Sequence, residues 1–595
     1  MNIDYQITGN GQLVNFGTIG YLTSSCFLGS FNNLVIRFMS LQKLNYDDSE
    51  INIAGLVGCS KAQQVTINDS NLQGNIGAAS NVALVCGIQT NTDFIINNII
   101  ISESNITGKS VQTQSICGGI FGHINGSAMN QYNNIKLSVF VQSSVQNNNQ
   151  QFTSSLIGYS SLLGNLNITN CNISETTIFS QSFASGAISF IFTSNISCQD
   201  ILIINSNIQS VDKSVTASGG LFAQIDNCIL TCKNIIVTQS NIYSDSGVPR
   251  ASGIISISLK STINILNSKI VNSTIRGYDS QQFGPMKIYT GQVSGVMAQS
   301  SSSSIIISDL KISDSNLSIT CRQHSVSGGI QGELRSVNSK ITNVKLYNNI
   351  IISISLNLNS HIGGINSVTS SGTTDYQQNV LLQYNYMHSQ AYAGNSHTGG
   401  LDGWVQNTNI SVYNAKILQF NQIVGGKSSG CGGFIGAVSI SQVNIMSSSI
   451  TDSNITANVT DNSVIGTGIG LLDDTKIAIF DNIVFKNIIH NLNGSNAYSG
   501  VFVALLRSTN KQNITLTQIR NSLIDSVQIQ SQAAYNNLKF ILYSQYPELE
   551  VGVILISSTK SIGFSNVKGI VVNNCDNVQV QQINGNNSIS NNGCI

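Results

Sequence analysis

The stretch Gly432-Gly433-Phe434-Ile435-Gly436 decides the fold of this chain, because variants of it recur along most of the sequence. Each copy has a glycine, two or three apolar residues and often a second glycine or small residue. Clear copies begin at Gly55, Gly119, Gly220, Gly253, Gly295, Gly329, Gly400 and Gly433, and weaker copies at Gly87, Ser155, Gly186, Gly364, Gly468 and Gly500. Successive copies lie 31 to 36 residues apart, with one longer step of 42. Such spacing indicates a repeat array.

Between the glycine phrases, apolar and polar residues alternate in short runs rich in isoleucine and valine, as in residues 135–139, 305–312 and 445–450. This alternation is typical of β-strands. Apolar residues at helical spacing are not sustained over ten or more positions, so we expect very little helix. Each unit of about 34 residues therefore contains three short strands separated by polar corners.

Asparagine and serine are suited to those corners. Asparagine tolerates left-handed backbone, and both side chains can bond the main chain locally. A Ser-Asn-Ile or Ser-Asn-Leu phrase recurs, for example in Asn205-Ser206-Asn207-Ile208 and Asp314-Ser315-Asn316-Leu317. We expect the asparagines of successive coils to pair along the stack, as in other in-register β stacks.

The predicted fold is an all-β, single-chain parallel β-helix or β-solenoid of about fourteen coils, each of about 34 residues with three short strands. Residues 51–535 are predicted to form the repeats. The ends of a solenoid must not propagate strand pairing. Residues 1–50 are therefore predicted to be an N-terminal cap or irregular first coil, and residues 536–595 to be C-terminal coils or a cap.

The composition of the chain excludes some classes of binding partner. Charged residues make up 9% of the chain, against about 25% in a typical soluble domain, and the net charge is zero. The chain therefore lacks the basic surface that nucleic acid would require. The chain contains no run of about eighteen apolar residues, so we expect no membrane span. Residues 1–20 lack the basic region and apolar run of a secretory signal peptide.

The twelve cysteines do not form the paired, close spacing of zinc ribbons or disulfide scaffolds. Cys117 and Cys431 precede a Gly-Gly pair, where Ser218 and Ser327 stand in other copies. A small residue is wanted there, and cysteine can serve as a small buried hydrophobe. We expect mostly free, inert thiols.

The phrases Gly55-Leu56-Val57-Gly58 and Gly432-Gly433-Phe434-Ile435-Gly436 resemble the GLUG repeat of surface-exposed and secreted repetitive proteins. Over residues 51–535 the chain also resembles the wider group of pectin-lyase-like right-handed β-helices. The resemblance implies a β-solenoid used for attachment or as a spacer, at the cell surface or after secretion. It supplies no catalytic residue.

Enzymatic sites find little support in the sequence. Asp473-Asp474 is the only double aspartate in the repeats and is interpreted as a corner. The six histidines show neither HxH nor HxxxH spacing. We predict no catalytic residue, no metal ligand and no cofactor.

The densest aromatic zone lies at residues 373–404. It contains the candidate binding residues Trp404, Tyr384, Tyr386 and Tyr392, since aromatic rings can stack on sugars or anchor protein contacts. An inserted loop with ordinary packing is the alternative interpretation of this zone.

The favoured function is a non-enzymatic adhesin, spacer or interaction scaffold whose partners are glycans or cell-surface proteins. The alternative is a carbohydrate-active β-helix enzyme, a polysaccharide lyase or hydrolase. Such an enzyme would need three or more acidic or basic side chains converging on one sheet face. A third hypothesis, an ice-binding solenoid, requires a ranked Thr-x-Thr ladder, but only scattered cases such as Thr515-Leu516-Thr517 occur.

Overall fold

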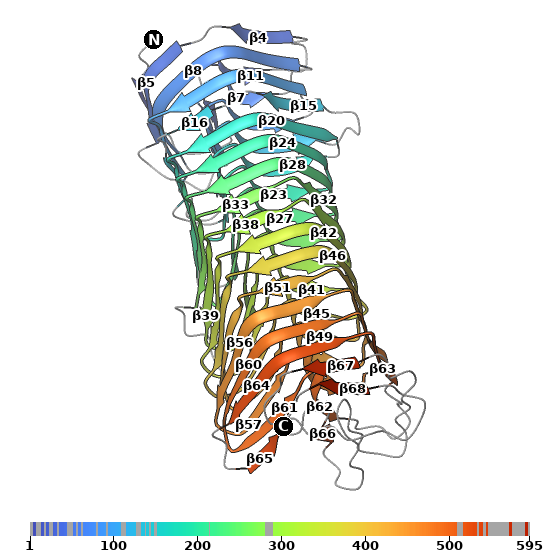
Figure 1. Ribbon diagram of the computed structural model, residues 1–595. Helices are drawn as coiled ribbons and strands as arrows, with labels where there is room; N and C mark the ends of the chain where they lie inside the picture. The colour runs from blue at the N-terminus through green and yellow to red at the C-terminus, as the bar shows by residue number, and fades with distance from the viewer. Residues whose placement is uncertain are drawn as a thin grey trace. The chain divides into compact units, whose positions relative to one another are not determined.

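The computed structural model forms two compact units, each a stack of parallel strands (Figure 1). Unit 1 comprises Met1–Phe283 with Val296–Ala298, and unit 2 comprises Gly284–Gly295 with Gln299–Ile595. The structure describes side chains for residues 83–86, 94–106, 116–125, 135, 152–161, 164–212, 215–279, 290–475, 477–495, 498–505, 519 and 521–527, and gives strand assignments for some further residues.

The fold is all-β, with 74% strand and no helix among the described residues. It is a β-solenoid with about 10 turns of ~34 residues. The fourteen coils expected from the glycine phrases include turns that lie partly outside the described residues. The predicted boundaries of the caps, 1–50 and 536–595, also fall largely outside them and stay predictions.

Each turn crosses three parallel sheets, which we call A, B and C. One turn of unit 1 runs through the A strands β24 (Asn195–Ile204) and β25 (Asn207–Val211) to the B strand β26 (Val215–Gly219) and the C strand β27 (Phe222–Asp226). A turn of unit 2 follows the same order in β42 (Asn338–Tyr347), β43 (Ile350–Ser355), β44 (Ser360–Gly363) and β45 (Asn366–Ser370).

The turns are stacked in register. In unit 1, β24 pairs parallel with β28 (Ile229–Thr238), so that Ile196 lies beside Leu230 and Cys198 beside Cys232. In unit 2, β42 pairs parallel with β46 (Thr374–Gln383) in the same manner. The repeat spacing of the sequence therefore becomes the vertical spacing between neighbouring strands, about 4.8 Å per turn.

The expected three strands per turn correspond to these three sheets, but the A face is subdivided by bends. Asp200 and Asn205 have left-handed φ values of 55° and 50° and bend the chain within and after β24. Asn343 and Asn348 do the same in unit 2, with φ of 55° and 52°. Left-handed backbone costs asparagine and aspartate less than other non-glycine residues, which explains their frequency at the corners.

Serines that follow the corner residues point into the core and seal the bends. Ser240, 1% exposed, donates from Oγ to the Thr238 carbonyl oxygen at 2.9 Å. The same Oγ accepts a hydrogen bond from the Ser206 backbone N–H of the previous turn at 3.3 Å. Each such serine satisfies backbone groups that the bend leaves without a strand partner, which buried backbone requires.

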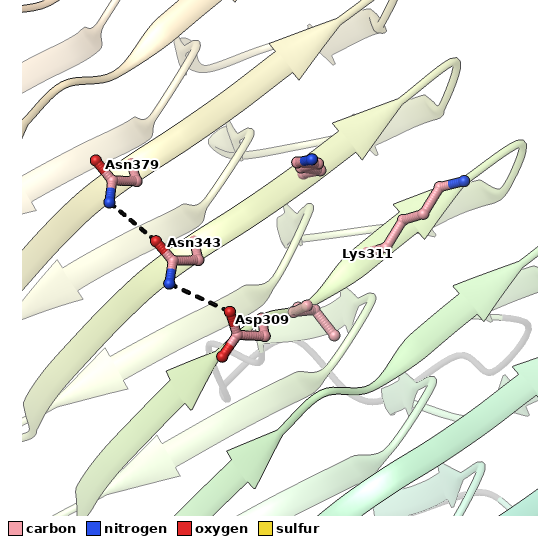
Figure 2. A pocket seen from close by; sticks show the side chains of 6 residues that line it. Asp309, Lys311, Asn343 and Asn379 are labelled. Atoms are coloured by element: carbon pink, nitrogen blue, oxygen red, sulfur yellow. Dashed lines mark hydrogen bonds between the residues drawn. The ribbon is translucent and has the colours of Figure 1, made fainter.

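The outer side of the corners carries ladders of amide side chains, as the asparagine-rich sequence predicts. In unit 2, Asn343 donates from Nδ2 to Asp309 Oδ1 at 3.2 Å, and Asn379 donates to Asn343 Oδ1 at 2.9 Å (Figure 2). Asn414 continues this ladder to Asn379 at 2.8 Å. Asp200, Asn234 and Asn267 form the equivalent ladder in unit 1.

The Gly-Gly pair makes the turn from sheet B to sheet C, and both glycines are required by space. A Cβ atom at Gly219 would overlap the carbonyl oxygen of Phe222, three residues later in the same turn. A Cβ atom at Gly220 would overlap the carbonyl oxygen of Gly253, in the next turn. The glycine phrase therefore serves a tight bend and close packing between coils.

The cysteine prediction is confirmed for the eight described cysteines, which form no disulfide and are all buried. Cys431 lies at its expected place before the Gly432-Gly433 pair, and burial raises the pKa of its thiol to about 12. Such a thiol remains protonated at neutral pH and is a poor nucleophile.

Candidate functional site

The side chains that point away from the core on sheets B and C meet one another along the Gly-Gly turn, and we call this surface the outer corner. In unit 1 its described B residues are Phe152, Phe183, Ala217 and Arg250, and its C residues are His123, Tyr159, Phe190, Gln224 and Ile257. The B and C rows each follow strand register, so residues of successive turns lie side by side. Side chains that usually face solvent thereby pack against each other.

Aromatic rings fill the outer corner of unit 1. Phe152 and Phe183, on the B strands β18 (Gln151–Ser154) and β22 (Phe183–Ser185), stack with ring centroids 5.4 Å apart. Tyr159 and Phe190, on the C strands β19 (Ile157–Leu162) and β23 (Ile188–Phe192), stack at 5.3 Å with an interplanar angle of 7°. Phe152 lies 5.2 Å from both Tyr159 and Phe190, so four rings form one cluster.

His123, on β14 (Phe121–Gly126), extends this cluster by an edge contact with Tyr159 at 4.9 Å. Burial lowers the pKa of His123 to about 4, so its ring is neutral at neutral pH. Tyr159, Phe183, Phe190 and His123 are each only partly buried. The cluster therefore offers uncharged, partly exposed ring surface, which suits stacking against a flat apolar face of a ligand.

The outer corner of unit 2 carries a second, smaller stack. His361 of β44 and His397 of β48 (Asn395–Gly399) lie parallel, with centroids 5.1 Å apart and Nδ1 atoms 3.2 Å apart. Trp404, on the C strand β49 (Asp402–Gln406), stacks on His361 at 5.2 Å. Burial, followed by the neighbouring His397 and His324, holds the pKa of His361 well below its usual value.

The four residues predicted as a binding site do not come together. Trp404 is in the outer corner, whereas Tyr386 lies in the A strand β47 (Tyr386–Ala391), with Tyr384 before it and Tyr392 after it. Tyr384 contacts Tyr347, at 5.4 Å between centroids, and Tyr386 contacts His388, at 6.4 Å. No ring contact joins any two of the four predicted residues in the described structure. The zone 373–404 is also not an inserted loop, because β46 to β49 pass through it in strand register.

Two charged side chains also lie in the outer corner of unit 2. Glu333 and Arg335 of β41 (Gln331–Arg335) form an ion pair, and Gln292 of β35 (Thr290–Ser294) donates to Glu333. Glu333 is 5% exposed. This pair falls short of the three converging acidic or basic side chains that a carbohydrate-active enzyme was expected to show.

A separate cluster of ionisable groups is enclosed in the core of unit 2. Asn366 donates from Nδ2 to Asp375 Oδ2 and to Asp402 Oδ1, both at 2.9 Å. Gln377 donates from Nε2 to Asp375 Oδ2 at 2.6 Å and to Asp402 Oδ2 at 2.9 Å. All four side chains are at most 1% exposed, so two amides bridge two carboxyl groups in a closed ring.

Burial dominates the ionisation of this cluster. It raises the pKa of Asp375 to about 6, and burial together with the charge of Asp375 raises the pKa of Asp402 well above its usual value. The carboxyl pair therefore retains a proton at pH values at which exposed aspartates are fully ionised. Because the ring is closed to solvent, we assign it to the architecture and not to a ligand site.

The other predicted features behave as structure. Asp474 has the left-handed φ of 46° that is typical of the corner residues, which confirms its interpretation as a corner. Among the described residues, no group of three or more His, Cys, Asp or Glu side chains is arranged to hold a metal ion. No helix with the length and hydrophobicity needed to cross a bilayer occurs in the described part of the chain.

Sequence reasoning missed the aromatic cluster of unit 1, although its signal was present. Phe152 and Phe183 are 31 residues apart, and so are Tyr159 and Phe190. That distance is one repeat, so both pairs had to become neighbours on adjacent strands. In a solenoid, rings separated by one repeat meet in space, whereas rings crowded within one repeat are spread over different sheets.

Comparisons with known proteins give no relatives: no family model, no curated protein and no solved structure matches this chain.

Proposed function

We propose that this chain is a non-enzymatic binding scaffold of a surface or secreted protein, an adhesin or spacer, and that the outer corner of unit 1 binds neutral glycans. The resemblance to GLUG-repeat and pectin-lyase-like proteins favours this class. The observation that carries the proposal is the aromatic cluster of unit 1, in which Tyr159, Phe183 and Phe190 present adjacent, partly exposed rings around the buried Phe152. The C–H face of a sugar ring packs favourably on such surfaces, which have a negative π face.

The geometry favours an extended ligand. Neighbouring rings on one sheet are set by neighbouring strands, about 4.8 Å apart, so the ring row runs along the stack of turns. A polysaccharide lying along this row could contact several rings at once, and many weak contacts of this type add up to useful avidity. An attachment protein needs this kind of binding more than one deep pocket.

The test uses the full chain and a panel of neutral oligosaccharides, with affinity measured by calorimetry. The variant Tyr159→Ala should weaken binding about fivefold, because an aromatic stacking contact contributes roughly 1 kcal/mol, whereas a tenfold change would need about 1.4 kcal/mol. Tyr278→Ala is the matched control, since Tyr278 is 47% exposed on another face of unit 1. Equal binding by both variants, or no binding by the natural chain, would contradict the proposal.

A carbohydrate-active enzyme remains the second candidate, because Glu333 and Arg335 share the outer corner of unit 2 with His361 and Trp404. A carboxyl group near an aromatic platform could serve general acid–base chemistry, and the permanently charged guanidinium beside it could stabilise negative charge. Incubation of the chain with the same panel, followed by assay of new reducing or unsaturated ends, separates the two functions. Turnover that is lost in Glu333→Gln would replace the scaffold with an enzyme.

A further inference from the structure

The outer face of sheet A in unit 2 carries a column of lysines, in a chain that has little charge. Lys311 of β38 (Lys311–Ser313) lies in register with Lys345 of β42. Lys345 is in register with Leu381, and Leu381 with Lys416 of β51 (Lys416–Leu418). These three lysines, all exposed, form one column along the stack, which we call the lysine column.

None of the three lysines of the column forms an ion pair with a described residue. In the described structure the only ion pairs are Arg335–Glu333 and Lys427–Asp461. Lysines directly opposite each other on adjacent strands repel, which destabilises a sheet. The adjacent Lys311 and Lys345 therefore leave an electrostatic cost that an anionic ligand would relieve.

A surface depression lies beside the column. It has a volume of about 480 Å³ and is lined by Asp309, Leu310, Lys311, Asn343, Lys345 and Asn379. Figure 2 shows the ladder from Asn379 through Asn343 to Asp309 on one side, and the extended side chain of Lys311 on the other. The Asp309 oxygens already accept hydrogen bonds from Asn343 and from Ser308, so this carboxylate is held at the ladder, away from an ion pair with either lysine.

Exposed aromatic rings flank the same face. Lys340 Nζ lies 5.9 Å from the ring centroid of Tyr376, and Tyr376 lies 5.6 Å from Tyr413. On the other flank, Tyr347 and Tyr384 are 42% and 44% exposed. The lysine ammonium groups of this face offer positive charge to a ligand, and the partly exposed tyrosine rings beside them offer surfaces for stacking.

We propose that this face of unit 2 binds an acidic polysaccharide, one that carries carboxylate or sulfate groups along its length. Adjacent lysines one strand spacing apart, about 4.8 Å, can address anionic groups on consecutive sugar units, and the tyrosines can stack on the sugar rings. The amide ladder supplies neutral hydrogen-bonding groups for hydroxyls. Nucleic acid fits less well, because the whole chain has zero net charge and nucleic-acid binding relies on an extensive basic surface.

This inference rests on the proposed glycan-binding function but uses a different surface, so the two can fail separately. The experiment measures binding of the full chain to polygalacturonate, dextran sulfate, dextran and single-stranded DNA at increasing NaCl concentrations. The natural chain should bind at least one of the two acidic polysaccharides, with affinity that falls as salt rises, and should not bind dextran through this face. The two acidic probes distinguish carboxylate from sulfate recognition.

The variant K311Q/K345Q/K416Q should weaken binding of the acidic polysaccharide about tenfold, as expected for the joint loss of several exposed charge contacts. The matched control K233Q/K260Q/R276Q removes the same charge from exposed basic residues of unit 1 and should change the affinity less than about twofold. Equal losses in the two variants, or tighter binding to DNA than to either acidic polysaccharide, would overturn the inference. Tyr159→Ala should leave acidic-polysaccharide binding intact, which separates this site from the outer corner of unit 1.

Discussion

The interiors of the two units differ in polarity although their backbones follow the same path. Phe222 begins a C strand of unit 1, and Leu230 and Cys232 follow at the second and fourth positions of β28. In unit 2 the same positions hold Asn366, Asp375 and Gln377. All six side chains are buried. The stack therefore accepts a ring of hydrogen-bonded polar side chains where it elsewhere has hydrocarbon.

This difference shows which features specify the fold. What the two interiors share is the Gly-Gly turn, the left-handed corner residues and the inward serines or their substitutes. In unit 2, Asn349 takes the place of a corner serine and accepts the Ser315 backbone N–H at 3.1 Å. The corners set the register of the turns, and in-register strands then fix which side chains meet, whatever their polarity.

The largest loss of stability is expected where the Gly-Gly turn, which both units share, is disrupted. Gly220→Val in unit 1 and Gly364→Val in unit 2 would drive a side chain into the carbonyl oxygens of Gly253 and Gly400. Because a backbone carbonyl cannot move aside without displacing its strand, each substitution should cost more than about 4 kcal/mol. Hydrogen exchange by mass spectrometry should show loss of amide protection in the unit that carries the change.

Gly372→Ala is the control for this prediction. Gly372 has a left-handed φ of 79°, but a Cβ atom there meets nothing within 4 Å, so only the conformational cost of roughly 1–2 kcal/mol applies. A loss at Gly220 or Gly364 no greater than that at Gly372 would show that close packing of the coils does not limit stability.

The next largest effect is a pH-dependent loss of stability in unit 2, which arises from the buried carboxyl groups of its polar interior. In the folded chain the pKa of Asp375 is raised from 3.8 to about 6. Burial and the charge of Asp375 raise the pKa of Asp402 well above its usual value. A raised carboxyl pKa contributes stability that is complete below the unfolded pKa and is lost as pH rises through the folded pKa. Unit 2 should therefore lose on the order of 3 kcal/mol between pH 4 and pH 7.

The double variant D375N/D402N tests this pH dependence, because it keeps the size of both side chains and removes both titrating groups. Amide protection of the strands around Asp375 should fall with rising pH in the natural chain, after correction for intrinsic exchange, and stay level in the variant. Protection around Leu230 in unit 1 serves as the internal reference. A parallel pH response in both units would assign the effect to some other group.

The sequence was informative where structure repeats and uninformative where it deviates. The glycine phrases predicted the repeat of about 34 residues, and the Ser-Asn-Ile phrase predicted the corner at Asn205, because both patterns recur with the turns that the backbone must make. The ring of Asp375 and Asp402 was not predicted, although Gln331 and Asp402 stand where other glycine phrases carry apolar residues. Recognising it requires knowing that the second and fourth positions of the next A strand face the same interior point.

The candidate site shows the same limit. Trp404 was identified from its sequence neighbourhood, but its partners His361 and His397 are one repeat apart on the B strands, and Tyr384, Tyr386 and Tyr392 lie on or beside an A strand. Sequence crowding selects residues of one turn, whereas binding surfaces of a solenoid run across turns. Columns of residues at the repeat spacing are therefore the useful pattern to search.

The smallest loss of stability should be the same in both units, because the substitutions remove a corner hydrogen bond that both units share. Ser240→Ala in unit 1 leaves the Ser206 backbone N–H without its acceptor, and Ser453→Ala in unit 2 does the same to Phe420. A buried N–H that loses its partner costs about 1–3 kcal/mol, and Ser304→Ala on the exposed face should stay within roughly 0.5 kcal/mol. Thermal unfolding of the three variants measures the order. If replacing the corner serines cost no more stability than replacing Ser304, the register would have to be set by the glycine turns alone. The coils around the polar interior of unit 2 would then be held in place by the hydrogen bonds of that interior.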